Sequence, residues 1–411
     1  MARRRRSRGR PVAFIALALA ALGGIGIGAL AAGAVGPSST PRSSLAAVPT
    51  PSASPASSAA EPTPETTPGA SESPLVTPSP TPTPIPTPAL VPDPLTGRMV
   101  TQAVAQRHVI AVMIDDQQDA RPQSGFTDAS VVWQAPAEGG IPRYMMLFHD
   151  RVAPSVGPVR SSRLYFIAWA AEWDAVYAHV GGSPQALKLL REQGRGQVVY
   201  NADEFRWGGI FFHRTKDRFA PHNVYTSGKE LRSLSKRLGA ADGPIKAAWK
   251  FAPDAPYAER PTGGRITAAY SYNQIVYRYD RKTNTYLRTV TGSKTQIDRG
   301  TNKQVAPKNV IVMVMSFAPL NDGSKKHRLE AQFTGSGTAW ISTNGMTIKG
   351  TWRKRSMADP TRFYDASGKL VTLTQGQTFV QVMPRGSKIV FKAGTPPPTA
   401  SVSGHKGYQP Q

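Results

Sequence analysis

Apolar and polar positions follow three different patterns along the chain, and these patterns predict its organisation. An almost uncharged apolar run covers residues 12–35, and a Pro/Ser/Thr-rich stretch with few large aliphatic residues covers 37–92. From about residue 93, short apolar runs alternate with polar turns. The first run has the roughly twenty residues that a bilayer-spanning helix needs. The second cannot bury enough apolar surface to fold, so we expect the folded part to begin after residue 92.

Between residues 93 and 255 the pattern alternates between strand and helix periods. Short β-branched runs predict strands at 108–114, 130–134, 144–149 and 175–180. Apolar residues at helical spacing predict helices at 161–174, 184–192 and 229–238. We therefore expect a mixed α/β domain over residues 93–255.

The helical period disappears beyond about residue 261. Short alternating runs between Gly, Asn and Asp turns predict strands at 266–270, 275–279, 285–291, 310–316, 328–333, 346–353 and 378–383. This spacing is typical of a sandwich or a partly closed barrel. We expect a β-rich domain over 256–393, an α+β fold class for the whole chain, and a disordered tail over 394–411.

The charge pattern at the N-terminus predicts a membrane topology. Six arginines lie within residues 1–10, directly before the apolar run, and arginines in this position stay on the cytoplasmic side. We expect a cytoplasmic segment over 1–10, a single-pass signal-anchor over 11–36 and an extracytoplasmic stalk over 37–92. A cleaved signal is the alternative, because small residues such as Ala29 and Ala31 fit a cleavage pattern. The length of the apolar run favours a retained anchor in the cell membrane.

The remaining sequence is strongly basic and contains no cysteine. Without the six N-terminal arginines and the stalk's net charge of −2, residues 93–411 carry +20 of the total +24. Such a domain is attracted to polyanions, which outside the cytoplasm are phosphate polymers, lipid headgroups and peptidoglycan carboxylates rather than nucleic acid. The alternative is that the charge serves solubility.

The absence of cysteine excludes disulfides and zinc–thiolate sites, and no motif indicates a metal or a cofactor. The sequence does not predict the oligomeric state.

Two junctions between a strand, a turn and a helix could bind an anion. In the first, Gly181 and Gly182 permit a sharp turn, and Ser183 suits the N-cap of the following helix. Backbone N–H groups at a helix N-terminus bind anions. In the second, Arg160 and Arg163 lie with two serines at the start of the preceding helix, where a bound carboxylate or phosphate would explain them.

Neighbouring residues supply candidate acid/base groups and further ligands. Glu138 lies before Gly139 and Gly140 at a strand end, where desolvation could raise its pKa, and His179 lies at the end of another strand; both are candidate catalytic residues. Alternatively, Arg160 and Arg163 pair with Glu138 or Asp115 in a structural network. Further candidate ligand-binding residues are Arg121, Gln123, Arg143, His222 and Asn223.

Several motifs resemble one family. They are Arg121-Pro-Gln-Ser-Gly125, Glu138-Gly-Gly-Ile-Pro-Arg143, Gly157-Pro-Val-Arg-Ser-Ser-Arg163, His179-Val-Gly-Gly-Ser-Pro-Gln185 and Pro221-His-Asn-Val-Tyr225. Together with the C-terminal half, they resemble the YerB-like family of bacterial cell-envelope lipoproteins, whose function is unknown. The resemblance implies a two-part fold outside the membrane, an α/β part followed by a β part. Without cysteine this chain cannot be lipidated as a lipoprotein is, so an anchor helix would substitute.

These observations lead to three hypotheses about function. The first is a membrane-tethered extracytoplasmic protein that binds an anionic wall polymer or an envelope partner during wall assembly or maintenance. The second is an envelope hydrolase or transferase acting on a glycan or phosphate ester, with Glu138 or His179 as acid/base and Arg160 and Arg163 holding the anion. The third is a structural adaptor for membrane proteins.

Overall fold

The computed structural model describes residues 89–192, 198–291 and 294–397. The predicted cytoplasmic segment and signal-anchor, nearly all of the stalk and most of the tail lie outside these residues. Within the described part, no helix is both long enough and apolar enough to cross a membrane.

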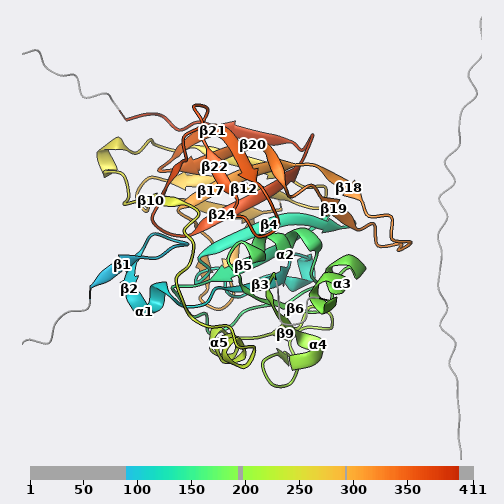
Figure 1. Cartoon of the computed structure of the whole chain (residues 1–411). Helices are drawn as coiled ribbons and strands as arrows, with labels where there is room; N and C mark the ends of the chain where they lie inside the picture. The colour runs from blue at the N-terminus through green and yellow to red at the C-terminus, as the bar shows by residue number, and fades with distance from the viewer. Residues whose placement is uncertain (1–88, 193–197, 292–293, 398–411) are drawn as a thin grey trace, which may run out of the picture. The chain divides into compact units, whose positions relative to one another are not determined.

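A mixed sheet of ten strands forms the centre of the described part (Figure 1). From one edge to the other its strands are β22 (Arg362–Tyr364), β21 (Met346–Lys354), β20 (Gly335–Thr343), β17 (Asn309–Met315), β24 (Thr378–Pro384), β4 (Val131–Glu138), β5 (Ile141–Phe148), β3 (Ile110–Asp115), β6 (Val176–His179) and β7 (Tyr200–Asp203). Strands β17, β24 and β4 are parallel neighbours, as are β3, β6 and β7, while the other pairs are antiparallel.

This sheet crosses the expected domain boundary near residue 255. Strand β24 pairs in parallel with β4, with Thr378 opposite Val131. Nearly every residue of both strands is buried, as in strands covered on both faces. The expected α/β half therefore does not have a sheet of its own, because its strands and those of the second half belong to one hydrogen-bonded sheet. The molecule as described is β-rich and has few helices.

A second sheet of five strands covers part of one face. Its order is β14 (Lys294–Thr295), β13 (Thr285–Val290), β12 (Gln274–Asp280), β11 (Arg265–Ala269) and β25 (Ile389–Lys392). Tyr277 and Tyr286 of this sheet share a core with Val312 and Phe379 of the central sheet. Two sheets therefore pack over a common core, and strands of both halves contribute to it.

Helices and short strands complete the two faces. On the face opposite the second sheet, α2 (Leu164–Ala171) is buried except at its first residue, and Trp169 stacks on Trp133 with ring centroids 4.6 Å apart. The other helices are α1 (Gln102–Ala105), α3 (Pro184–Glu192), α4 (Glu204–Trp207), α5 (Gly228–Arg237), η1 (Gln118–Ala120) and η2 (Tyr257–Glu259). The remaining strands are β1 (Leu90–Pro92), β2 (Met99–Thr101), β8 (His213–Arg214), β9 (Val224–Tyr225), β10 (Lys250–Ala252), β15 (Ile297–Asp298), β16 (Lys303–Gln304), β18 (Phe317–Pro319), β19 (Leu329–Ala331) and β23 (Thr372–Thr374).

Three predicted boundaries need correction. The stalk does not extend to residue 92, because Leu90–Pro92 form β1 and pair with β2. The tail does not begin at 394, because Thr395 pairs with Thr262. Helix α2 begins at Leu164 rather than near 161, and its N-cap makes no side-chain hydrogen bond. Ser161 and Ser162, which the sequence places at the start of this helix, therefore precede it and do not cap it.

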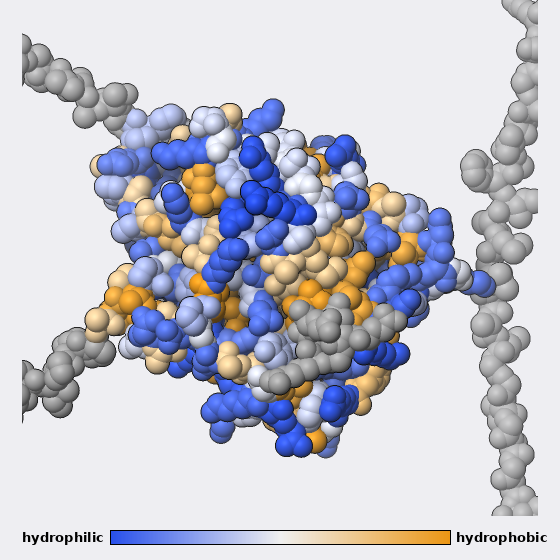
Figure 2. All heavy atoms as spheres, viewed as in Figure 1, coloured by the Kyte–Doolittle hydropathy of each residue, from blue (hydrophilic) through white to orange (hydrophobic). Residues whose placement is uncertain are grey.

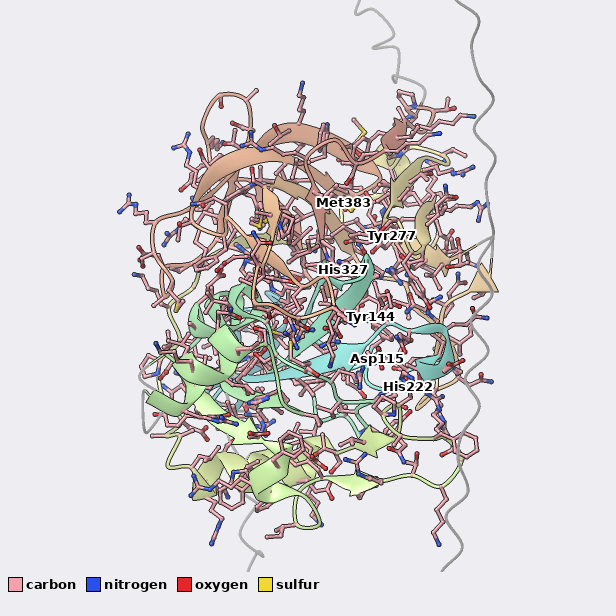
Figure 3. All side chains as sticks on the ribbon, turned by 90° about the vertical axis from the view of Figure 1, so that its right-hand side faces the viewer. Asp115, Tyr144, His222, Tyr277, His327 and Met383 are labelled. Atoms are coloured by element: carbon pink, nitrogen blue, oxygen red, sulfur yellow. The ribbon has the colours of Figure 1, made fainter. Side chains whose placement is uncertain are left out.

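A buried arginine joins the two sheets. Arg288 of β13 is fully buried; its Nε donates to the Tyr277 hydroxyl at 2.9 Å and its Nη1 to the Tyr144 hydroxyl at 3.1 Å. Its Nη2 donates to Gln134 Oε1 at 2.5 Å. Burial opposes the charge, but Tyr144, Tyr277 and Asp116 outweigh burial and raise the pKa of Arg288. Tyr144 and Tyr277 lie above Asp115 in Figure 3.

Candidate functional site

Four strand ends bring polar residues to one edge of the central sheet. Strands β3, β4, β6 and β7 run in the same direction, so their C-terminal ends lie at the same edge. Asp115, Glu138, His179 and Asp203 are the last residues of these strands. Arg143 on β5 is the pairing partner of Asp115. Ligands commonly bind at such strand ends in open sheets.

The extended segment before α2 places Arg160 at this edge. Its backbone N–H donates to the Met113 carbonyl at 2.9 Å, and its carbonyl accepts from the Val180 N–H at 3.1 Å. Arg160 is therefore held between the ends of β3 and β6, within reach of Asp115.

One carboxylate oxygen holds both Arg160 and His222. Asp115 Oδ2 lies 3.0 Å from Arg160 Nε and 2.7 Å from His222 Nδ1. The Nε atom of Arg160 is close enough for an ion pair but is not oriented for a hydrogen bond. The Asp115 side chain is 2% exposed, against 15% for Arg160 and 12% for His222. Figure 3 shows Asp115 and His222 side by side, so a buried carboxylate orients two partly accessible groups.

Glu138 is the centre of a second ionic cluster. Its Oε1 accepts from Arg143 Nη2 at 2.7 Å, and its Oε2 accepts from Arg163 Nη2 at 2.5 Å. Arg328 Nε lies 3.9 Å from the same Oε2. Burial opposes ionisation, but the neighbouring arginines outweigh it and hold the pKa of Glu138 below its ordinary value. These contacts favour an ionised structural partner over the catalytic acid expected from the sequence.

The two clusters together form what we call the edge site: Asp115, Arg160 and His222 with Glu138, Arg143 and Arg163. Burial lowers the pKa of Arg160, and the charge of Arg143 lowers it further, while Asp115 and Glu138 oppose this shift. Burial also lowers the pKa of Arg163, to about 10. Within the described residues, the buried Nε atoms of Arg160, Arg163 and Arg328 have no hydrogen-bond partner. The edge site therefore places three arginines against two carboxylates, which leaves an excess of positive charge.

A glycine turn follows β6, and the His179 ring binds the backbone of this turn instead of standing free as an acid/base group. Ser183 caps α3, with the Ala186 N–H donating to Ser183 Oγ at 3.3 Å. Gly181 has φ +61°, and a Cβ on Gly182 would lie 3.2 Å from Ser162 Cβ. His179 is fully buried, with Nδ1 donating to the Gly181 carbonyl at 2.8 Å and Nε2 lying 2.8 Å from Asn201 Oδ1. These contacts favour a structural role for His179.

The other candidate ligand residues surround the edge site without forming one cluster with it. Gln123 Nε2 donates to the Asp115 carbonyl at 2.8 Å. Arg121 instead pairs with Asp116, Nη2 to Oδ1 at 2.8 Å. Gln123 and Arg121 both line a cavity of about 380 Å³ beside the second sheet. Asn223 accepts from Arg214 Nη1 at 3.0 Å and so holds the chain next to His222.

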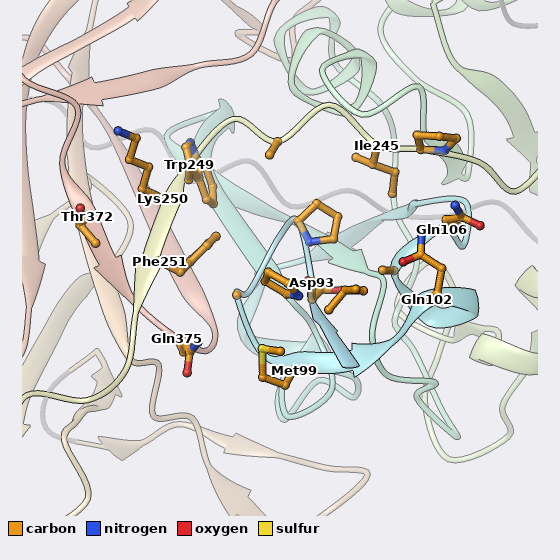
Figure 4. Close-up of a pocket in the computed structure, with 17 residues that line it drawn as sticks. Asp93, Met99, Gln102, Gln106, Ile245, Trp249, Lys250, Phe251, Thr372 and Gln375 are labelled. Atoms are coloured by element: carbon orange, nitrogen blue, oxygen red, sulfur yellow. The ribbon is translucent and has the colours of Figure 1, made fainter. Parts of the chain in front are cut away.

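A larger cavity lies elsewhere. It has a volume of about 720 Å³ and separates the β1–β2 hairpin from β10, with Met99, Ile245 and Phe251 among its walls (Figure 4). None of the residues predicted for the site lines it. Within the described residues, no group of three His, Asp or Glu side chains is placed to hold a metal ion.

Sequence reasoning missed three contacts of this region. Asp116 is fully buried and accepts from Arg121 and from Gln134 Nε2, the latter at 2.6 Å. Asn201 contacts His179, and Arg328 approaches Glu138. Asp116 directly follows Asp115 at the end of β3, so the sequence could have indicated it as a second carboxylate of this region. Arg328 gave none, because 190 residues separate it from Glu138 in the sequence.

Comparisons with known proteins agree with this architecture. Residues 95–241 match the N-terminal domain of a protein family of unknown function, DUF3048, and residues 266–380 match its C-terminal domain. A putative lipoprotein YerB of Bacillus subtilis (strain 168) is 30% identical over 301 residues, which cover 71% of this chain and 86% of the relative. The crystal structure of YerB from Bacillus subtilis has a TM-score of 0.64 at 25% identity and covers 73% of this chain and 99% of the solved chain. The chain therefore belongs to the two-part DUF3048 family, in which YerB is a relative.

Proposed function

We propose that the protein is a membrane-tethered, extracytoplasmic envelope protein that binds an anionic cell-wall component at the edge site, in wall assembly or maintenance. The name of the relative, a putative lipoprotein, supports a location at the envelope. The observation that carries the proposal is the surplus of arginines over carboxylates at the edge site, where the N–H donors of Arg160 belong to the most accessible of the three guanidinium groups. A phosphate or carboxylate of the ligand would accept from these donors, in the charge-assisted bonds that arginine makes best.

The test is binding of poly(glycerol phosphate) to the full chain, measured by isothermal titration calorimetry. Arg160→Ala should weaken binding at least tenfold, about 1.4 kcal/mol, because Arg160 is the least buried arginine of the edge site. Arg278→Ala is the matched control, since Arg278 is exposed on β12 and forms no ion pair with another residue of the described part. Equal losses in the two variants would show attraction to surface charge in general and would contradict a defined site.

A second candidate function is hydrolysis of a phosphate ester, supported by the contact between Asp115 and His222. Because His222 uses Nδ1 for Asp115, its Nε2 remains for proton transfer, the arrangement of a general base oriented by a carboxylate. Release of p-nitrophenol from bis(p-nitrophenyl) phosphate by the full chain, abolished in His222→Gln but retained in His213→Gln, would favour this candidate. Binding of poly(glycerol phosphate) without any turnover favours the first proposal.

A further inference from the structure

The most exposed apolar side chains of the described part lie in one segment, residues 205–219, which we call the 205–219 loop. Phe219 is 92% exposed, Phe205 72% and Ile210 66%. The next large apolar side chain is Tyr257, at 57%. Exposing large apolar side chains to water is unfavourable. Three such side chains within fifteen residues therefore require an explanation.

The base of this loop is fixed to the folded core. Trp207 and Phe212 are buried in the core that lies under the second sheet. Arg214 donates to Glu204 Oε1 at 3.3 Å and to Asn223 Oδ1 at 3.0 Å, and β8 pairs with β9. The exposed side chains therefore project from turns with an ordered base, and their exposure does not result from a detached segment.

The charge of the loop is positive. It contains four basic residues and one acidic residue. Arg206, Arg214 and Lys216 are exposed. The acidic residue, Asp217, is neutralised by Arg299, with Nη1 2.8 Å from its carboxylate. Exposed apolar side chains thus alternate with cations, and the loop's carboxylate is already paired.

We propose that the 205–219 loop docks on an anionic lipid surface next to the edge site, since the His222 N–H donates to the Phe219 carbonyl at 2.9 Å. Apolar side chains among Lys and Arg are the pattern of segments that lie in a membrane interface, where rings enter the headgroup region and cations meet lipid phosphates. A protein interface would place its apolar groups in one continuous, charge-depleted centre. Along the sequence of the loop, cations lie between the exposed apolar residues.

The absence of cysteine from the chain makes the test direct. Phe219→Cys carries a polarity-sensitive fluorophore in the full chain, reconstituted in phosphatidylglycerol or phosphatidylcholine vesicles. The control is Met346→Cys, because Met346 is 56% exposed and begins β21, which is next to the edge strand β22 at the side of the ten-stranded sheet away from β7. The label at 219 should shift to the blue on phosphatidylglycerol and be quenched by nitroxides on the lipid chains, whereas the label at 346 should do neither.

Charge reversal completes the test. Arg206→Glu with Lys216→Glu, in the Phe219→Cys chain, should abolish the blue shift on phosphatidylglycerol, and thermal unfolding checks that the fold is intact. A label at 219 that stays water-like on phosphatidylglycerol overturns the proposal. Equal shifts at 219 and 346 also overturn it. A shift that requires an added envelope protein would assign the loop to a protein partner instead.

Discussion

At the scale of single residues, the arginines of the edge site differ in how exposed their side chains are, and therefore in how much stability their removal should cost. Arg163 is 2% exposed and relies on Glu138 for its ion pair. Arg160 is 15% exposed and lies nearer the solvent. Removing a partner of a buried charge costs far more than removing an accessible one. The side chain that binds a ligand should therefore be distinguishable from those that hold the site together.

We expect Arg163→Ala to lower the free energy of unfolding by about 3–5 kcal/mol, because it leaves Glu138 partly buried with one arginine fewer. Arg160→Ala should cost less, about 1–3 kcal/mol, because the buried Asp115 keeps its contacts with His222 and with the Gln117 N–H. Urea denaturation of the two variants measures the difference. If Arg160→Ala proved as costly as Arg163→Ala, the cluster at Asp115 would be structural rather than a place for a ligand.

The depressed pKa of Glu138 predicts an acid dependence of stability. A carboxyl whose folded pKa lies below its unfolded value stabilises the fold fully above the unfolded value, ordinarily 4.5 for Glu. That contribution is lost as the pH falls through the lower, folded value. The stability difference between the wild type and Glu138→Gln should therefore be largest near neutral pH and shrink in acid. A difference independent of pH would mean that ionisation of Glu138 does not stabilise the fold.

At the scale of elements, local patterns predicted strands and helices more accurately than contacts. The predicted strands are all present, although β4 and β5 are longer than predicted, and α3 has the predicted bounds. Strand β20 was missed because it begins with Gly335-Ser-Gly337, which interrupts the alternation of apolar residues.

The contact between Asp115 and His222 could not be predicted from the sequence. The two residues are 107 positions apart, and the spacing of apolar residues carries no information about contacts between such distant positions. The sequence did supply the pairing of Arg163 with Glu138 and of Arg160 with Asp115 as an alternative, and these ion pairs are present.

Two N-caps allow the role of the glycine turn to be tested. Ser183 caps α3 and Ser227 caps α5, where the Glu230 N–H donates to Ser227 Oγ at 3.2 Å. Ser183→Ala and Ser227→Ala should each cost about 1 kcal/mol of stability in thermal or urea unfolding. If the turn before α3 contributes to the anion site, Ser183→Ala alone should also weaken poly(glycerol phosphate) binding. Equal binding by both variants would restrict the site to the arginines.

At the scale of the whole molecule, the two halves matched by the family are parts of one hydrogen-bonded structure. Strand β24 connects β17 to β4 within the central sheet, and Arg288 connects the two sheets. We expect calorimetry to show one unfolding transition, with equal calorimetric and van't Hoff enthalpies. Residues 93–255 and 256–393 produced as separate chains should not fold. Two resolved transitions, or a folded isolated half, would contradict this expectation.

The position of β24 also affects the order in which the chain can fold. Strand β4 is complete once residue 138 has been synthesised, yet its neighbour on one side begins at Thr378. During translation, the hydrogen-bonding groups along that side of β4 therefore wait for some 240 further residues. An unpaired inner strand is a template for pairing with other chains, and slow, non-local pairing prolongs its exposure. Chains that end before Thr378 should therefore aggregate. Pairing of β24 with β4 is then the event that completes the central sheet and commits the protein to its fold.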